Sequence, residues 1–173
     1  MIRSTSWHAL WILIVALAFA APAEARRGKN IHQSPPDLTA GGEPDDTRDW
    51  RLGPLGANGW VFNRNSRRGA SREARQILIT RVDEDGPAHG QLKVGDVIVG
   101  IDDKPFDRDA RIMLADAINE AEKEANAGEL TLSVFRDGKT TPVTVELPVM
   151  GSFSPTAPYE CPKTDRIIDQ AVE

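Results

Sequence analysis

The stretch Gly86–Phe106, GPAHGQLKVGDVIVGIDDKPF, decides the fold of this chain, because it surrounds one short apolar run with turn residues. The run is Val97–Ile101, and its apolar character on both faces predicts a central, buried strand. Gly95 permits a sharp turn with positive φ, and Asp96 can accept backbone N–H groups that hold that turn. Asp102–Lys104 then turns the chain out toward the next element. These are scaffold features, so we expect substitution of Gly95 or Asp96 to lower stability.

The rest of the pattern predicts a small α+β domain. Residues 107–127 have apolar positions at helical spacing and predict the one long helix, with Asp107 or Asp109 as its N-cap and Gly128 just past its end. Asp137-Gly138 lies between two alternating stretches and predicts a β-hairpin with a few extra loop residues. The five predicted strands are 59–62, 76–82, 97–101, 130–136 and 142–149. We expect a small, partly open antiparallel β-barrel or sandwich that is capped by one long helix.

The N-terminus predicts export. Arg3 precedes the apolar run Ala9–Ala21, and Ala23-Glu24-Ala25 ends it, which is typical of a secretory signal peptide over residues 1–25. We expect cleavage after Ala25, a secreted or periplasmic protein, and no membrane attachment afterwards; an uncleaved anchor is the alternative. The other predicted segments are a disordered linker over 26–49, a domain over 50–150, and a proline-containing tail over 151–173 with a short helix from Thr164.

Several function classes are disfavoured. A net charge of −5 argues against a nucleic-acid partner, and the basic stretch Arg64–Arg75 fits a solvated loop. The three histidines lack metal-ligand spacing, so neither a metal nor another cofactor is predicted. Gly138-Lys139-Thr140 resembles the end of a phosphate-binding loop, but Ser133 stands where that motif needs glycine. No nucleophile elbow is present, and we predict that the chain is not an enzyme. The single cysteine, Cys161, is either a buried small side chain or a partner for another chain's thiol.

The order of these residues resembles a PDZ domain. The resemblance covers about Leu52–Val149 and is closest to the bacterial kind found behind secreted serine proteases. It is carried by Val82, Gly86-Pro87-Ala88, Leu92, Gly95-Asp96-Val97-Ile98, Ile101, Pro105-Phe106 and Arg136-Asp137-Gly138-Lys139. The flanking stretches WRLGPLGANGW and LPVMGSFSPTAPYECPKTDRII are similar to a family of secreted bacterial PDZ-containing proteins of unknown function.

The resemblance implies a binding function. In such a domain the C-terminus of a partner protein or peptide adds as a strand between a groove strand and the long helix, and a glycine-containing loop holds its carboxylate. The best match to that loop is Asn58–Val61, and Arg51 could assist the carboxylate. Core packing is the alternative role for Trp60 and the helix residues. The predicted peptide-binding residues are Arg51, Asn58, Gly59, Trp60, Val61, Phe62, Ala110, Ile112, Met113 and Leu114.

Two alternatives stay open from the sequence. The chain could be a regulatory or accessory domain of a secreted enzyme whose catalytic part lies outside this chain. It could also have a structural role, with the groove blocked by the loop 63–75 or by the C-terminal tail. An open strand edge beside residues 59–62 would favour the binding function over the structural one.

Overall fold

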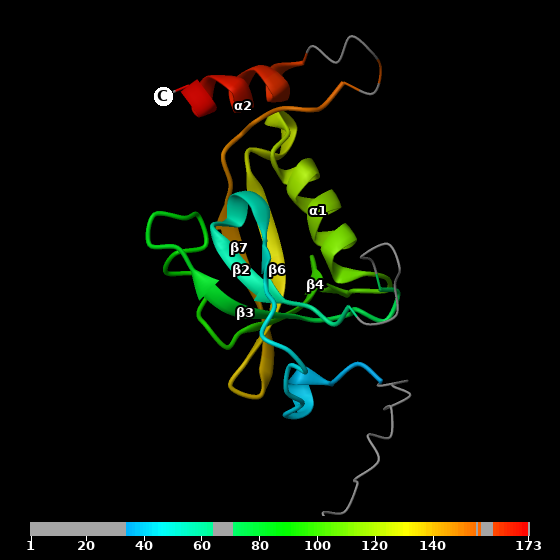
Figure 1. Cartoon of the computed structure of the whole chain (residues 1–173). Helices are drawn as coiled ribbons and strands as arrows, with labels where there is room; N and C mark the ends of the chain where they lie inside the picture. The colour runs from blue at the N-terminus through cyan, green and yellow to red at the C-terminus, as the bar shows by residue number, and fades with distance from the viewer. Residues whose placement is uncertain (1–33, 64–70, 155, 157–160, 173) are drawn as a thin grey trace, which may run out of the picture. The chain divides into compact units, whose positions relative to one another are not determined.

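The computed structural model describes residues 34–63, 71–154, 156 and 161–172, and their elements form one antiparallel sheet with helices beside it (Figure 1). The strands are β1 (Trp50–Arg51), β2 (Ala57–Trp60), β3 (Ile77–Val82), β4 (Val97–Ile101), β5 (Lys104–Pro105), β6 (Glu129–Arg136) and β7 (Lys139–Glu146). The α-helices are α1 (Ala110–Ala121) and α2 (Pro162–Val172), and the 3-10 helices are η1 (Leu38–Ala40), η2 (Gly53–Leu55) and η3 (Glu124–Asn126).

The sheet has seven strands in the order β1-β2-β3-β4-β6-β7, and β5 pairs with β4 beside this path. Each strand pair is antiparallel, so the predicted α+β fold is confirmed as an open antiparallel sheet with a long helix. All five predicted strands are present, although β2 and β7 begin and end earlier than expected. The two-residue strands β1 and β5 were not predicted, because two residues are too few to show an alternating pattern.

Tight turns set the register of two hairpins. Asp137 and Gly138 have φ of 51° and 78°, and Arg136 pairs directly with Lys139 across them. The hairpin prediction is confirmed, but the expected extra loop residues are absent because two residues with positive φ close the turn by themselves. Asp102 and Asp103, with φ of 48° and 60°, close the β4–β5 hairpin in the same way.

The turn into the central strand behaves as the sequence predicts. Gly95 has a φ of 95°, and the buried carboxylate of Asp96 accepts the backbone N–H of Lys93 at 2.7 Å. The same carboxylate also accepts Nε and Nη2 of Arg136, each at 2.6 Å. Asp96 therefore ties the start of β4 to the end of β6, in addition to holding its own turn.

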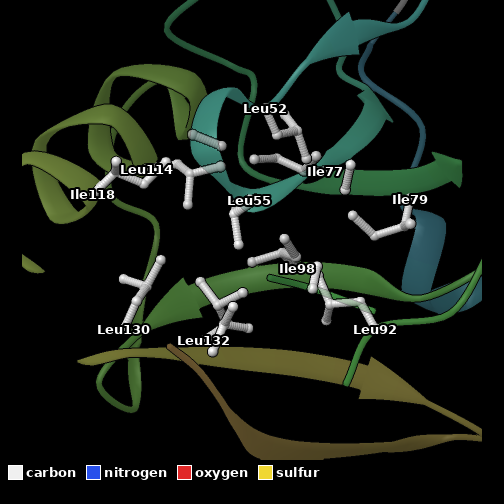
Figure 2. Close-up of a cluster of buried hydrophobic side chains, with 14 of the residues drawn as sticks. Leu52, Leu55, Ile77, Ile79, Leu92, Ile98, Leu114, Ile118, Leu130 and Leu132 are labelled. Carbon is white, nitrogen blue, oxygen red and sulfur yellow. The ribbon is translucent and has the colours of Figure 1, made fainter. Parts of the chain in front are cut away.

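The core lies between the sheet and α1. Figure 2 shows Ile77 of β3 and Ile98 of β4 in this core, together with Leu55 of η2 and Leu114 of α1. The buried face of α1 consists of Ala110, Leu114, Ile118 and Ala121, which recur at helical spacing. The helix is shorter than predicted at both ends: Asp109 is the N-cap, and residues 124–126 form η3 instead of a continuing α-helix.

Part of the segment predicted as a linker over 26–49 makes hydrogen bonds with residues of the sheet region. The N–H of Leu38 donates to Oε1 of Gln76 at 2.7 Å, and Nε1 of Trp60 donates to Oδ1 of Asp46 at 3.1 Å. Polar groups of 34–49 therefore contact β2 and the residue that precedes β3. Residues 1–33, which include the predicted signal peptide, lie outside the described residues.

Within the described part of the chain, no helix combines the length and the apolar character needed to cross a bilayer.

Candidate functional site

Three segments that are far apart in the sequence enclose a groove of about 900 Å³. The first wall is β1 with the turn that follows it, Leu52–Pro54, and the second is one face of α1. The third wall comes from the described residues of 148–172, which we call the C-terminal arm and which include α2. The groove thus lies between the first strand of the sheet, its long helix and the end of the chain.

The first wall is an edge of the sheet. Among the residues that the structure describes, β1 is the terminal strand of the sheet and pairs with β2 on one side only. The N–H of Leu52 donates to the carbonyl of Ala57 at 2.9 Å. Because successive residues of an antiparallel strand alternate in direction, the N–H and C=O of Arg51 point away from β2. Arg51 therefore offers one donor and one acceptor on the side of β1 that is free of a strand.

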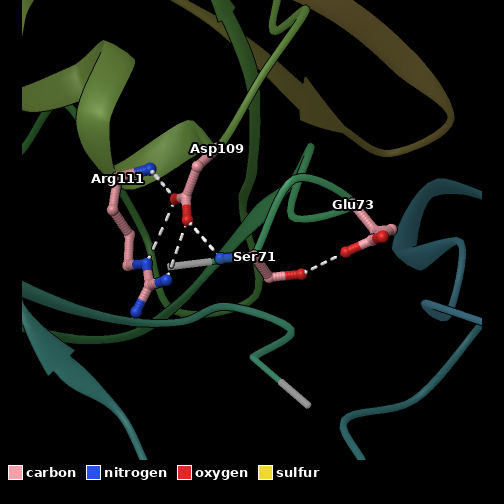
Figure 3. Close-up of polar contacts among 4 residues, drawn as sticks. All are labelled: Ser71, Glu73, Asp109 and Arg111. Atoms are coloured by element: carbon pink, nitrogen blue, oxygen red, sulfur yellow. Dashed lines mark hydrogen bonds and ion pairs between the residues drawn. The ribbon is translucent and has the colours of Figure 1, made fainter. Parts of the chain in front are cut away.

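The second wall is held in place at the start of α1. The N–H of Ala110 donates to the carbonyl of Ala74 at 2.7 Å, and the N–H of Ser71 donates to Oδ2 of Asp109 at 2.7 Å. Oδ1 of Asp109 accepts the N–H of Arg111 at 3.0 Å, as expected of an N-cap residue (Figure 3). The guanidinium of Arg111 then lies over the ring of Trp50, 5.1 Å from its centroid. This contact joins the helix to β1 across one end of the groove.

Asp109 is ionised well below neutral pH. Burial raises its pKa, but hydrogen bonds from the Arg111 side chain, the Arg111 N–H and the Ser71 N–H outweigh burial and hold the pKa below its ordinary value. Nε and Nη2 of Arg111 lie 3.1 and 2.8 Å from the two carboxylate oxygens. The pair is therefore a closed, neutral unit at the groove wall.

The third wall is attached by a buried cation. Lys163 of α2 forms an ion pair with Glu122 at the end of α1, and its Nζ donates to Oδ1 of Asn119 at 2.8 Å. The N–H groups of Met150 and Gly151 donate to the carbonyl of Glu122 at 3.0 and 2.9 Å. The C-terminal arm is thus attached at the C-terminal end of α1, through Asn119 and through both the charge and the backbone carbonyl of the C-cap residue Glu122.

The cations of the lining are neutralised. Arg51 pairs with Asp83 at 2.5 Å, Arg111 pairs with Asp109, and Lys163 pairs with Glu122. What remains in the groove is largely apolar surface. Four of its large apolar side chains are substantially exposed, namely Trp50 at 40%, Ile112 and Ile167 at 44% each, and Phe153 at 53%.

The predicted site residues divide into two groups. Arg51, Ile112 and Leu114 line the groove. The other predicted residues belong to the packed interior or to β2: Asn58, Gly59, Trp60, Val61, Phe62, Ala110 and Met113.

The predicted groove strand needs correction. Gly59 pairs with Trp50 of β1 on one side and with Ile79 of β3 on the other, so the edge beside it is not open. A Cβ on Gly59 would lie 2.5 Å from Cγ2 of Ile77, which shows that its free face meets the core. The available edge lies one strand further out, on β1, because the chain folds its own residues 50–51 against β2.

Sequence reasoning missed the turn after β1 and the C-terminal arm as groove walls. Leu52-Gly53-Pro54 is apolar on both sides of its glycine, whereas polar Asn58 precedes Gly59, and this difference could have placed the wall correctly. No comparable signal exists for Phe153 or Lys163, whose positions depend on contacts with α1. Of the two segments that could block the groove, the C-terminal arm lines it and leaves its volume of about 900 Å³ free. The other segment is the loop 63–75, of which residues 64–70 lie outside the described residues.

Among the residues that the structure describes, no three His, Cys, Asp or Glu side chains come together in a way that could hold a metal ion.

Comparison with known proteins places the fold. The sequence profile of the PDZ domain matches residues 58–147, more than half of the chain. A solved structure of a variant of the HtrA-type protease AlgW, determined with a decapeptide, is 27% identical to this chain with a TM-score of 0.35. That likeness covers 65% of this chain and 31% of the protease chain, so this chain spans about a third of the protease's length. No curated protein matches the chain. The match over residues 58–147 and the sheet with its long helix agree, and the chain belongs to the PDZ domain family.

Proposed function

We propose that this protein is a non-enzymatic binding module that takes an extended segment of a protein or peptide into the groove between β1, α1 and the C-terminal arm. The observation that carries the proposal is the clustering of exposed apolar side chains. Trp50, Ile112, Phe153 and Ile167 all line this one groove, although large apolar side chains are usually buried. A concave apolar site with few polar groups is the usual form of a ligand site.

The free side of β1 supports binding of an extended chain in particular. A strand edge recognises polypeptide through main-chain hydrogen bonds, and its neighbours provide pockets for side chains. The outward N–H and C=O of Arg51 can form such main-chain hydrogen bonds, and the apolar face of α1 offers contacts for the side chains of the ligand. PDZ domains typically bind peptides, and this groove is where we expect such a ligand in the present chain.

A matched pair of substitutions tests the site. Peptides are selected from a displayed library on the purified protein, and their dissociation constants are measured by fluorescence anisotropy. Ile112→Asp places a charge in the groove, whereas Val94→Asp places one at a side chain that is 67% exposed and lies outside it. We expect affinities near micromolar, about −8 kcal/mol, and a loss of about tenfold or more in Ile112→Asp alone. Equal binding by both variants, each shown to be folded by thermal unfolding, would refute this site.

We also propose that the protein is exported, on the basis of the residue pattern of 1–25. N-terminal sequencing of the mature protein from the extracytoplasmic fraction should begin at Arg26. Recovery of a chain that begins at Met1 would contradict export by cleavage.

A further inference from the structure

We infer that the groove takes an internal apolar stretch of its ligand and does not hold a terminal carboxylate. This inference deepens the proposed function and rests on it. Three independent features of the groove lead to it: the backbone donors around it, the charges of its lining, and the small length of strand that it offers.

The turn after β1 lacks the donors that a carboxylate needs. A backbone anion site requires several successive N–H groups that point to one place. Here the N–H of Leu52 is bonded to Ala57, Pro54 has none, and the N–H of Gly56 donates to Gly53 at 3.3 Å. Leu55 is completely buried. Within 52–56, Gly53 alone is left to present an N–H to the groove.

The start of α1, the other place where N–H groups gather, is already satisfied. The N–H of Ala110 donates to Ala74, and the N–H groups of Ile112 and Met113 both donate to the carbonyl of Asp109 at 3.1 Å. The N–H of Arg111 donates to the Asp109 carboxylate. A protein carboxylate therefore occupies the position at this helix end that an anionic ligand would need.

The side-chain charges lead to the same conclusion. Each cation of the lining, Arg51, Arg111 and Lys163, is paired with a carboxylate of the protein. A terminal carboxylate would therefore add a second negative charge beside one of these carboxylates, and in the case of Arg111 that carboxylate is the buried Asp109, which binds the guanidinium through both oxygens. An uncharged apolar segment adds no such charge, and it matches the exposed side chains of Trp50 and Phe153.

Because β1 is short, main-chain hydrogen bonds can contribute less to ligand binding than side-chain contacts do. Of its two residues, Arg51 alone has its N–H and C=O directed away from β2. A ligand strand can then form only about two main-chain hydrogen bonds with β1, both with Arg51. Apolar side-chain contacts must therefore supply most of the affinity. A ligand with bulky apolar side chains at alternate positions would fit this wall, since alternate side chains of a strand face the same way.

Peptides with altered ends test the inference. One selected core sequence is synthesised with a free C-terminus, with an amidated C-terminus, and with a Gly-Ser extension beyond it. We expect the three dissociation constants to agree within about threefold, and to change by less than about threefold between 0.05 and 0.5 M NaCl, because no ion pair with the ligand is involved. Replacing one apolar residue of the core by Asp should weaken binding by about tenfold or more.

The outcomes separate this inference from the function on which it rests. Binding of the free-acid peptide that is lost on amidation or extension, and that still depends on Ile112, overturns the internal-segment inference and leaves the binding function standing. Absence of binding by any selected peptide, or binding that is unchanged in Ile112→Asp, overturns the proposed site and the inference with it.

Discussion

Two buried carboxylates of this protein each form an ion pair with a basic side chain, but the two pairs have different roles. Asp96 precedes the central strand and pairs with Arg136, at the end of β6. Glu122 ends α1 and pairs with Lys163, which lies in α2 beyond the region that matches the PDZ profile. The first pair joins two strands of the sheet, and the second attaches a wall of the groove. The same chemistry thus maintains the fold at one place and completes a binding site at the other.

The largest effect on stability is expected at Asp96. Asp96→Ala removes the acceptor for Arg136 and for the N–H of Lys93, and both groups lie beside the central strand. Losing one partner of a buried pair is costly, so we expect the free energy of unfolding to fall by about 3 kcal/mol in urea titrations. Asp85→Ala, at an exposed turn residue, is the control. A similar fall in both variants would contradict the scaffold role of the Asp96 pair.

Asp109→Asn should have the next largest effect, about 2 kcal/mol at neutral pH, because it weakens the hydrogen bonds to Arg111 and Ser71. It should also change the response to acid. A carboxyl with a lowered pKa in the folded state stabilises the protein above its unfolded pKa, here near 3.8. That stability is lost as the pH falls through the folded pKa.

Urea midpoints measured from neutral pH down to about pH 3 check this sign. The wild-type protein should lose more stability than Asp109→Asn over that range, since the variant has no carboxyl to protonate at this position. Asp107→Asn, two residues away and exposed, should follow the wild-type curve. Parallel acid profiles for all three proteins would mean that Asp109 does not carry the effect.

Lys163→Met should have a smaller effect on global stability and a large one on the groove. The main apolar cluster takes its members from residues 52–147, so the C-terminal arm can detach without opening the core. We expect the global free energy of unfolding to change by less than about 1 kcal/mol, while amides of α2 exchange faster and peptide affinity falls by about tenfold. The exposed Lys139→Met is the control.

A second substitution sharpens this result. A buried ion pair can often be replaced by packed apolar residues without loss, so Lys163→Met combined with Glu122→Leu should recover much of the protection of α2. Unchanged exchange of α2 in the single variant would show that the arm is held by its other contacts, such as the hydrogen bonds of Met150 and Gly151.

The smallest effect is expected at an exposed pair between Arg108, which precedes α1, and Asp116 within α1. Nη2 of Arg108 lies 2.7 Å from Oδ2 of Asp116, with both side chains 58% exposed. Water and salt screen such a pair, so Arg108→Ala should change the free energy of unfolding by less than about 0.5 kcal/mol. If Arg108→Ala lowered the free energy of unfolding as much as Asp96→Ala does, burial could not explain why the Asp96 pair contributes more to stability than the exposed pair.

Most of the fold could be predicted, because its signals are local. Gly95, Asp102-Asp103 and Asp137-Gly138 mark turns by their own conformational preferences, and the apolar spacing of α1 marks its buried face. The resemblance to PDZ domains followed from the same residues and is confirmed by the family match. The signals failed where an element is too short to show a period, as in β1, and they gave no indication of the contacts that residues 38 and 46 make with Gln76 and Trp60.

The site was harder to place than the fold. Two glycines, Gly53 and Gly59, are candidates for the groove loop, and the apolar Leu52 before the first, against the polar Asn58 before the second, is only a weak reason to prefer Gly53. Strand pairing decides between them, because Gly59 is enclosed by β1 and β3 while Gly53 borders the groove. Lys163 was missed for a different reason: lysine is rarely buried, and its partners, Asn119 and Glu122, are more than forty positions away.

By itself the sequence determined where the chain turns and which apolar faces build the sheet and α1, since each depends on residues a few positions apart. Only the tertiary structure decided which strand edge is free, which cations are neutralised and which segment forms the third wall. Those features arise where residues 50–54, 109–122 and the described residues of the C-terminal arm meet, and no local pattern encodes contacts between such distant parts of a chain.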